Sequence, residues 1–109
     1  MINNLNKHLL GCPSIKSRYC VVCGEPATND HHVIIKGIGG SKYAKQIPTV
    51  SLCGMGNTSG CHGLAHSGRL FFDYRTSLKT GRKCWHYCKT DVPVSLFMAL
   101  EFGEWRECR

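Results

Sequence analysis

Long apolar segments are missing from this sequence. No stretch of it approaches the roughly 20 consecutive apolar residues that a membrane-spanning helix needs. The opening residues, MINNLNKHLLGC, contain no apolar core of the kind found in a secretory signal peptide. We therefore expect no membrane partner and a cytoplasmic protein. The cytoplasm is a reducing compartment, which favours thiolate–metal bonds over disulfides.

Acidic residues are scarce, and most of them gather in one part of the chain. Seven Asp and Glu stand against 14 Lys and Arg, which gives a formal net charge of +7. Residues 91–109 hold four of the seven acidic residues, so the rest of the chain is strongly basic. Such a body attracts polyanions because each neutralised phosphate releases condensed counterions. Nucleic acid is therefore a candidate partner, although ordinary solubility charge would produce the same balance.

Apolar residues are too few for a large hydrophobic core. Of 109 residues, 42% are hydrophobic and 12 are glycine, which predicts one small domain (residues 1–109) with a thin core. Eight cysteines and six histidines could supply the missing stability as metal ligands or, for the cysteines, as disulfides. The expected reducing compartment favours metal ligation.

Local patterns predict an α+β fold built from short elements. Turn-forming glycines and prolines separate the apolar runs, and no internal repeat is present. The predicted elements are a docking helix over residues 2–10 (with Ile2, Leu5 and Leu9 at helical spacing), a strand-like run over residues 33–35, a strand over residues 47–53, a short helix through His62 to His66 capped by Ser59, a hairpin of residues 69–74 and 82–88, and a last helix over residues 94–102 after Asp91 and Pro93.

The clearest local motif is Cys20-x2-Cys23. Two thiolates at this spacing can hold one Zn²⁺ through a tight knuckle turn, but the ion needs two more ligands. Cys53 and Cys61 are natural partners because they flank one loop and lie next to the histidine-bearing segments. Two unconnected core cysteines and a redox pair are the alternatives, and no βαβ pattern supports the redox pair.

Four histidines form a second candidate group. His62 and His66 are four residues apart, so on a helix they project from one face and can chelate one ion. His31 and His32 add a pair near a strand-forming run. Three imidazoles without a carboxylate would leave coordination positions for water and phosphate. The histidines could also be unconnected.

In combination, these motifs resemble the HNH, or ββα-metal, endonucleases, especially small phage and prophage members. The matching segments are CVVCG, DHHVI, GIGG, VSLC and GCHGLAH, which together cover about residues 19–68. The resemblance implies a small zinc-stabilised ββα-metal domain that residues 69–109 extend with a hairpin and a helix. It also implies a phosphodiester hydrolase from a phage or mobile element, acting in a bacterial host cell.

The resemblance also assigns roles to residues. It makes Cys20, Cys23, Cys53 and Cys61 the ligands of a structural Zn²⁺. It makes His31, His62 and His66 the ligands of one catalytic divalent ion (Mg²⁺, Mn²⁺, Ni²⁺ or Zn²⁺), with His32 as the general base. A shift of one residue would instead make Asp30 the ligand and His31 the base. We prefer the first register because Val33 and Ile34 then match the apolar pair of the family.

Two features depart from the family pattern. The spacer between Cys53 and Cys61 is longer than the usual two residues, which a surface loop tolerates at small entropic cost. The family's central Asn would fall at Pro48, and Asn57 in the longer spacer is the candidate substitute. This displacement keeps open a non-catalytic alternative, in which a zinc-ribbon module of the same fold binds nucleic acid or a protein partner, for example as a phage-encoded inhibitor.

Two further sets of residues each have two possible interpretations. Cys12, Cys84, Cys88 and Cys108, with His86, could form a second zinc site or could be buried as apolar side chains. Basic residues near the glycine-rich loop and the hairpin are candidates for phosphate contacts that hold DNA without reading its bases, and the alternative for each is a solvated surface charge. This second set comprises Lys36, Lys42, Lys45, Arg69, Arg82 and Lys83.

Overall fold

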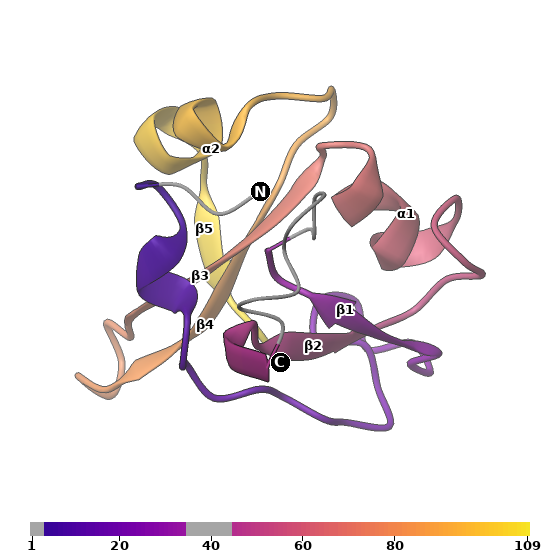
Figure 1. Cartoon of the computed structure of the whole chain (residues 1–109), viewed down its shortest axis with the longest axis horizontal. Helices are drawn as coiled ribbons and strands as arrows, with labels where there is room; N and C mark the ends of the chain where they lie inside the picture. Colours follow the sequence, from indigo (N-terminus) through magenta and orange to yellow (C-terminus); the bar gives the residue numbers. More distant parts are fainter. Residues whose placement is uncertain (1–3, 35–44) are drawn as a thin grey trace.

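Two short antiparallel strands and a helix lie next to each other in the chain and in space (Figure 1). The computed structural model describes residues 4–34 and 45–109. Strand β1 (Asn29–His32) pairs with β2 (Thr49–Leu52), and helix α1 (Gly60–His66) follows β2. The predicted second strand and second helix are confirmed. Ile2, Lys36 and Lys42, to which the sequence analysis assigns roles, lie outside the described residues.

A second antiparallel sheet follows, in the order β3-β4-β5. Strands β3 (Leu70–Thr76) and β4 (Lys83–Lys89) form the hairpin that the sequence predicts. Helix α2 (Leu96–Phe102) comes next, and β5 (Trp105–Glu107) returns to pair with β4. The sequence analysis missed β5, because three residues are too few to show an alternating pattern.

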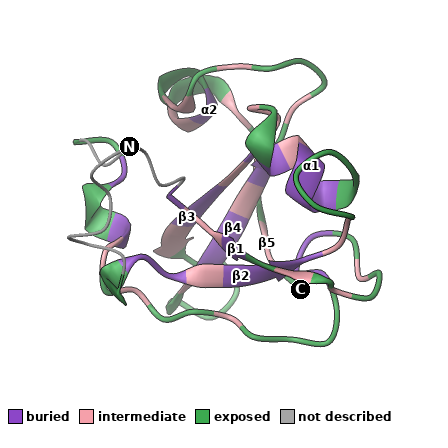
Figure 2. Ribbon diagram, turned by 45° about the vertical axis from the view of Figure 1, so that its right-hand side comes forward, coloured by how far each residue is buried: buried purple, intermediate pink, exposed green. Residues whose placement is uncertain are grey.

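The core lies between the two sheets and α1 (Figure 2). Val50 and Leu52 of β2 are fully buried, as are Val21 and Ile34 from the flanking loops. Phe72 of β3 and Trp85 of β4 close the core from the other sheet, and the Trp85 indole donates a hydrogen bond to the Pro13 carbonyl. The resulting fold is a small α+β arrangement of two sheets and two helices.

Two predicted elements near the N-terminus are wrong in extent. In place of a docking helix over residues 2–10, the described part contains one 3₁₀ turn, η1 (Lys7–Leu9), that buries Leu9. Leu10 already has an extended backbone (φ −61°, ψ 131°), which ends the helical turn after Leu9. The first strand ends at His32, and Val33 and Ile34 form a bend that places Ile34 in the core. The strand therefore carries both histidines instead of following them.

Each α-helix follows a serine, although the sequence analysis predicts only Ser59 as a cap. Ser95 accepts a hydrogen bond from the Met98 amide, so α2 begins at Leu96. Ser59 precedes α1, yet its hydroxyl accepts from the Met55 amide instead. Each helix has seven residues, and no helix within the described part is long and apolar enough to cross a membrane.

Candidate metal centres

Four cysteine thiols gather at the junction of the first sheet and α1. One sulfur from each of Cys20, Cys23, Cys53 and Cys61 lies within 4.8 Å of the others, and we call this group the sulfur cluster. The sulfurs of Cys23 and Cys53 are 3.5 Å apart. Four thiolates that bind one tetrahedral Zn²⁺ at ~2.3 Å have sulfurs about 3.8 Å apart, so the cluster fits the ion.

The knuckle turn prepares Cys20 to act as a thiolate. The Cys20 amide donates to the Glu25 carbonyl, and the Gly24 amide donates back to the Cys20 carbonyl, which closes the turn. A hydrogen bond from the Cys61 thiol, assisted by backbone amides including that of Cys23, lowers the pKa of Cys20 to about 4. The pKa of Cys61 is raised by the same hydrogen bond to Cys20 and by burial. Full deprotonation of the cluster therefore requires a cation among the sulfurs.

The long spacer between Cys53 and Cys61 folds back on itself. A Cβ atom on Gly60 would lie 2.6 Å from the Gly54 Cα, so the two ends of the loop touch. The Cys61 amide lies 3.4 Å from the Cys53 sulfur, and the His62 amide donates to the Cys53 carbonyl. The close approach of the two glycines thus lets cysteines eight residues apart act as a ligand pair.

This loop closure predicts a strong effect of Gly60→Ala. Gly60 has a φ of +61°, and its Cβ would meet backbone atoms of Cys53 and Gly54 at less than 3 Å. Alanine there should open the loop and weaken zinc binding at least tenfold, the effect of ~1.4 kcal/mol of strain. Gly81→Ala is the matched control, because Gly81 has a similar φ of +74° but open space around its Cβ position. Competition with a chromophoric chelator measures both affinities, and equal zinc affinities would refute the role of the glycine contact.

Three histidine side chains form a second group, which we call the histidine cluster. One ring nitrogen from each of His31, His62 and His66 lies within 4.8 Å of the others. The ring centroids of His62 and His66 are 4.6 Å apart, and that of His31 is 5.1 Å from His62 and 5.4 Å from His66. Strand β1 supplies His31 and one face of α1 supplies the other two. The structure therefore brings together the three histidines that the sequence groups.

The orientation of His62 fits metal binding. Its Nδ1–H donates to the Gly56 carbonyl at 2.7 Å, which leaves Nε2 of the neutral ring with a free lone pair. This Nε2 lies 3.1 Å from Nε2 of His66. Two imidazole nitrogens bound to one ion at ~2.0–2.1 Å in tetrahedral geometry are about 3.3 Å apart, so the spacing fits the ion.

Successive side chains of β1 point to opposite faces of the strand, which bears on whether His31 or Asp30 is the metal ligand. Asp30 is exposed, whereas His31 is 4% exposed and faces α1. Burial, followed by the nearby rings of His62, His66 and His32, lowers the pKa of His31 to about 3. His31 is therefore neutral at physiological pH, as a metal ligand must be. His32 follows on the opposite face of the strand and is half-buried.

The candidate substitute for the family Asn is not well placed. Asn57 is exposed in the turn before α1, and its neighbour Gly56 contacts His62 through a backbone carbonyl. The sequence analysis missed Asn29, whose amide donates to the Gly54 carbonyl and ties this loop to β1. A backbone hydrogen bond from the Val33 amide to the Pro48 carbonyl fixes the chain just after His32. No side-chain pattern could have indicated a backbone contact of this kind.

The predicted DNA-contacting cations within residues 45–109 do not share one surface. Arg69 lies between α1 and β3, and Lys45 is exposed before β2. Arg82 and Lys83 lie at the turn of the β3–β4 hairpin, on the opposite side of the molecule from α1 (Figure 1). The seven residues of β3 separate this turn from α1 by about 20 Å at ~3.3 Å per residue. A phosphate at the histidine cluster would thus be closer to Arg69 than to the hairpin turn.

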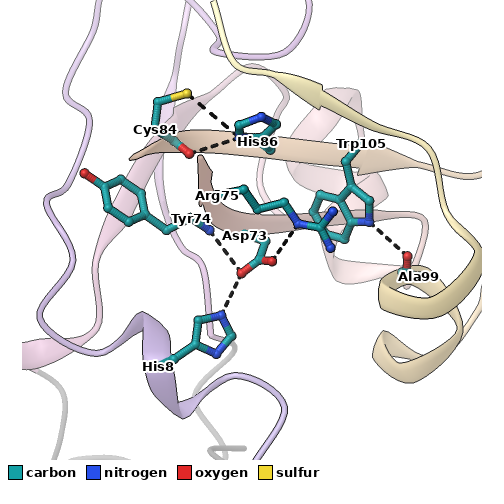
Figure 3. Close-up of polar contacts among 8 residues, drawn as sticks. All are labelled: His8, Asp73, Tyr74, Arg75, Cys84, His86, Ala99 and Trp105. Carbon is teal, nitrogen blue, oxygen red and sulfur yellow. Dashed lines mark hydrogen bonds and ion pairs between the residues drawn. The ribbon is translucent and has the colours of Figure 1, made fainter. Parts of the chain in front are cut away.

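The second zinc site considered for the remaining cysteines does not form. Within residues 4–34 and 45–109, the sulfur and histidine clusters are the two groups of three or more donors, and neither includes Cys12, Cys84, Cys88 or Cys108. The Cys84 sulfur lies 3.9 Å from His86 Nδ1, which is 3.0 Å from the Cys84 carbonyl (Figure 3). Cys88 packs against Gly103, where an added Cβ would meet its sulfur. Cys84 and Cys88 both belong to β4, whereas Cys12 and Cys108 lie outside the helices and strands.

Comparisons with protein-family models, with curated proteins and with solved structures find no match for this chain.

Proposed function

We propose that this protein is a metal-dependent DNA endonuclease or nickase of the HNH type. One observation carries the proposal: three imidazoles converge from a strand and a helix, and a fourth histidine adjoins them in the chain. A site with three nitrogen ligands keeps coordination positions for water and a phosphate oxygen. The order β1, β2, α1 is also the order that the family name ββα-metal describes.

His32 is the proposed general base. Its side chain projects from the face of β1 opposite to the ligand His31, so it is not a member of the histidine cluster, but it is close enough to His31 to help lower the pKa of that ring. An imidazole with an ordinary pKa near 6.5 can take a proton from water at neutral pH. A divalent ion held by the histidine cluster would stabilise the charge that develops on the phosphate and on the leaving 3′ oxygen.

The sulfur cluster has a structural role in this proposal. Cys53 and His62 are joined by a backbone hydrogen bond, and Cys61 precedes His62 in α1. A zinc ion held by four thiolates has no position open for substrate. The sulfur cluster therefore fixes α1 against β2 and thereby fixes two of the three histidines.

The proposed ligand register predicts different effects for two neighbouring substitutions. His31→Asn should lower the affinity of the histidine cluster for a divalent ion at least tenfold, because it removes one of three nitrogen ligands. Asp30→Asn should leave that affinity unchanged, because Asp30 is exposed on the other face of β1. The protein is first loaded with zinc in the sulfur cluster. Calorimetric titration with Ni²⁺ then measures the affinity of the histidine cluster in each variant. The opposite pattern would favour Asp30 as the ligand and His31 as the base.

The products of cleavage test the proposed reaction. Attack of water with departure of the 3′ oxygen leaves a 5′-phosphate and a 3′-hydroxyl, so a DNA ligase should reseal nicks made in a plasmid. Cleavage that leaves ends a ligase cannot join, or cleavage that persists in excess chelator, would contradict metal-dependent hydrolysis of this kind.

A non-catalytic binding module is the second candidate. It is favoured by Pro48 at the position of the family Asn and by the exposure of Asn57. In that case the sulfur cluster would stabilise the fold, and the basic surface would bind nucleic acid or a protein. DNA retention that depends on salt, together with intact DNA under every divalent ion, would support this candidate.

A further inference from the structure

A cavity of about 370 Å³ adjoins the histidine cluster. His31 and His66 belong to both the cluster and the cavity wall. The cavity reaches the surface, because its lining includes the exposed side chains of Leu5 and His66. Its volume is within the range of small-molecule sites, which begins at ~300 Å³.

The walls of this cavity suit an uncharged ring. Leu96 and Leu100 of α2 form one side, and Phe71 and Phe72 of β3 contribute to another. No lysine or arginine is among the described residues that line it. An apolar wall with aromatic members can pack against the face of a nucleobase.

The polar lining of the cavity offers a hydrogen-bond acceptor. Asp73 lies there with 7% exposure, and His8 Nε2 and the Tyr74 amide bind its Oδ1 at 2.7 and 3.0 Å (Figure 3). The Arg75 guanidinium holds its other carboxylate oxygen at 2.8 Å. Each carboxylate oxygen has more than one acceptor position, so Asp73 can also accept a hydrogen bond from an amino group of a base. Buried Asn6 also belongs to this lining.

From this arrangement we infer that the cavity holds an unpaired nucleobase next to the phosphate being cleaved. The inference rests on the proposed function, since it places that phosphate at the histidine cluster. A paired base cannot enter such a cavity without leaving the helix stack, which costs a few kcal/mol. The preferred substrate class is therefore DNA with unpaired nucleotides, such as bulges, flaps or single strands.

Binding measurements test the inference separately from catalysis. In the His32→Ala background, the protein should bind a labelled duplex with a one-nucleotide bulge at least about tenfold more tightly than the fully paired duplex, by fluorescence anisotropy. Leu100→Trp, which fills the cavity, should reduce the ratio of affinities to near one. Phe102→Trp is the matched control, because Phe102 is on the same helix and 75% exposed.

Each outcome separates the inference from the proposed function. Equal affinity for the two duplexes, or a preference that survives Leu100→Trp in a protein with parental metal content, would overturn the base pocket and leave the nuclease proposal standing. A preference lost with Leu100→Trp but kept with Phe102→Trp would support the pocket, even if the parental protein cleaved no DNA.

Discussion

Replacing Cys20 with serine should leave the protein largely unfolded at room temperature. Cys20 is 1% exposed, and its sulfur accepts hydrogen bonds from the Cys61 thiol and from backbone amides. Structural zinc contributes ~10–16 kcal/mol of apparent binding free energy in small zinc domains. This is of the same size as the ~5–15 kcal/mol by which most domains are stable, so loss of the ion should remove most of the folded state. Elemental analysis measures the loss of zinc, and circular dichroism measures the loss of the folded state.

Cys84→Ser is the control for this prediction. Cys84 is half-buried outside the sulfur cluster, and its sulfur lies 3.6 Å from a Glu107 carboxylate oxygen, a contact that a serine hydroxyl could keep. The variant should bind zinc like the parent and lose less than about 1 kcal/mol of stability. A Cys20→Ser protein that melts with the parental transition would show that the sulfur cluster does not hold the fold.

The second large effect concerns catalysis. His32→Ala should lower the rate of DNA cleavage by about 10²–10⁴, the usual contribution of a positioned general base. Its folding and its content of bound metal should stay near the parental values, because His32 is not a member of the histidine cluster. Steady-state cleavage of a labelled oligonucleotide gives the rate, and elemental analysis gives the metal.

His62→Ala provides the contrast. His62 belongs to the histidine cluster and donates to the Gly56 carbonyl, so its loss should lower both metal occupancy and rate. If His32→Ala cleaves at the parental rate, then His32 is not the base. If His32→Ala also loses the divalent ion, then it acts as a ligand and the assigned register is wrong.

Short sequence spacings were enough to predict which side chains gather. Cys20 and Cys23 are fixed by one turn, and His62 and His66 by one turn of helix, so each pair follows from local geometry. The choice between Asp30 and His31 was harder, since a strand that slips by one residue exchanges its two faces. The pairing of His31 with Val50 sets the face in the structure, and no local pattern encodes that pairing.

The features that the sequence did not reveal depend on contacts between distant segments. Arg109 donates from its amide to the Val21 carbonyl and from Nε to the Val22 carbonyl, so the chain after β5 holds the knuckle turn. The second zinc site was considered because four cysteines and His86 remain outside the sulfur cluster, but the sulfurs of Cys84 and Cys88 have different neighbours. The cavity beside His31 also combines elements that are far apart in the chain.

Cleavage of supercoiled plasmid as a function of added metal tests the central claim most directly. The protein is prepared with about one zinc ion per chain in the sulfur cluster, freed of loosely bound metal, and compared with His62→Ala. The account predicts intact plasmid without added metal, and nicked or linear plasmid when Mg²⁺, Mn²⁺ or Ni²⁺ is added to the parental protein. Intact plasmid with every ion, from a parental protein that is folded and loaded with zinc, would contradict it.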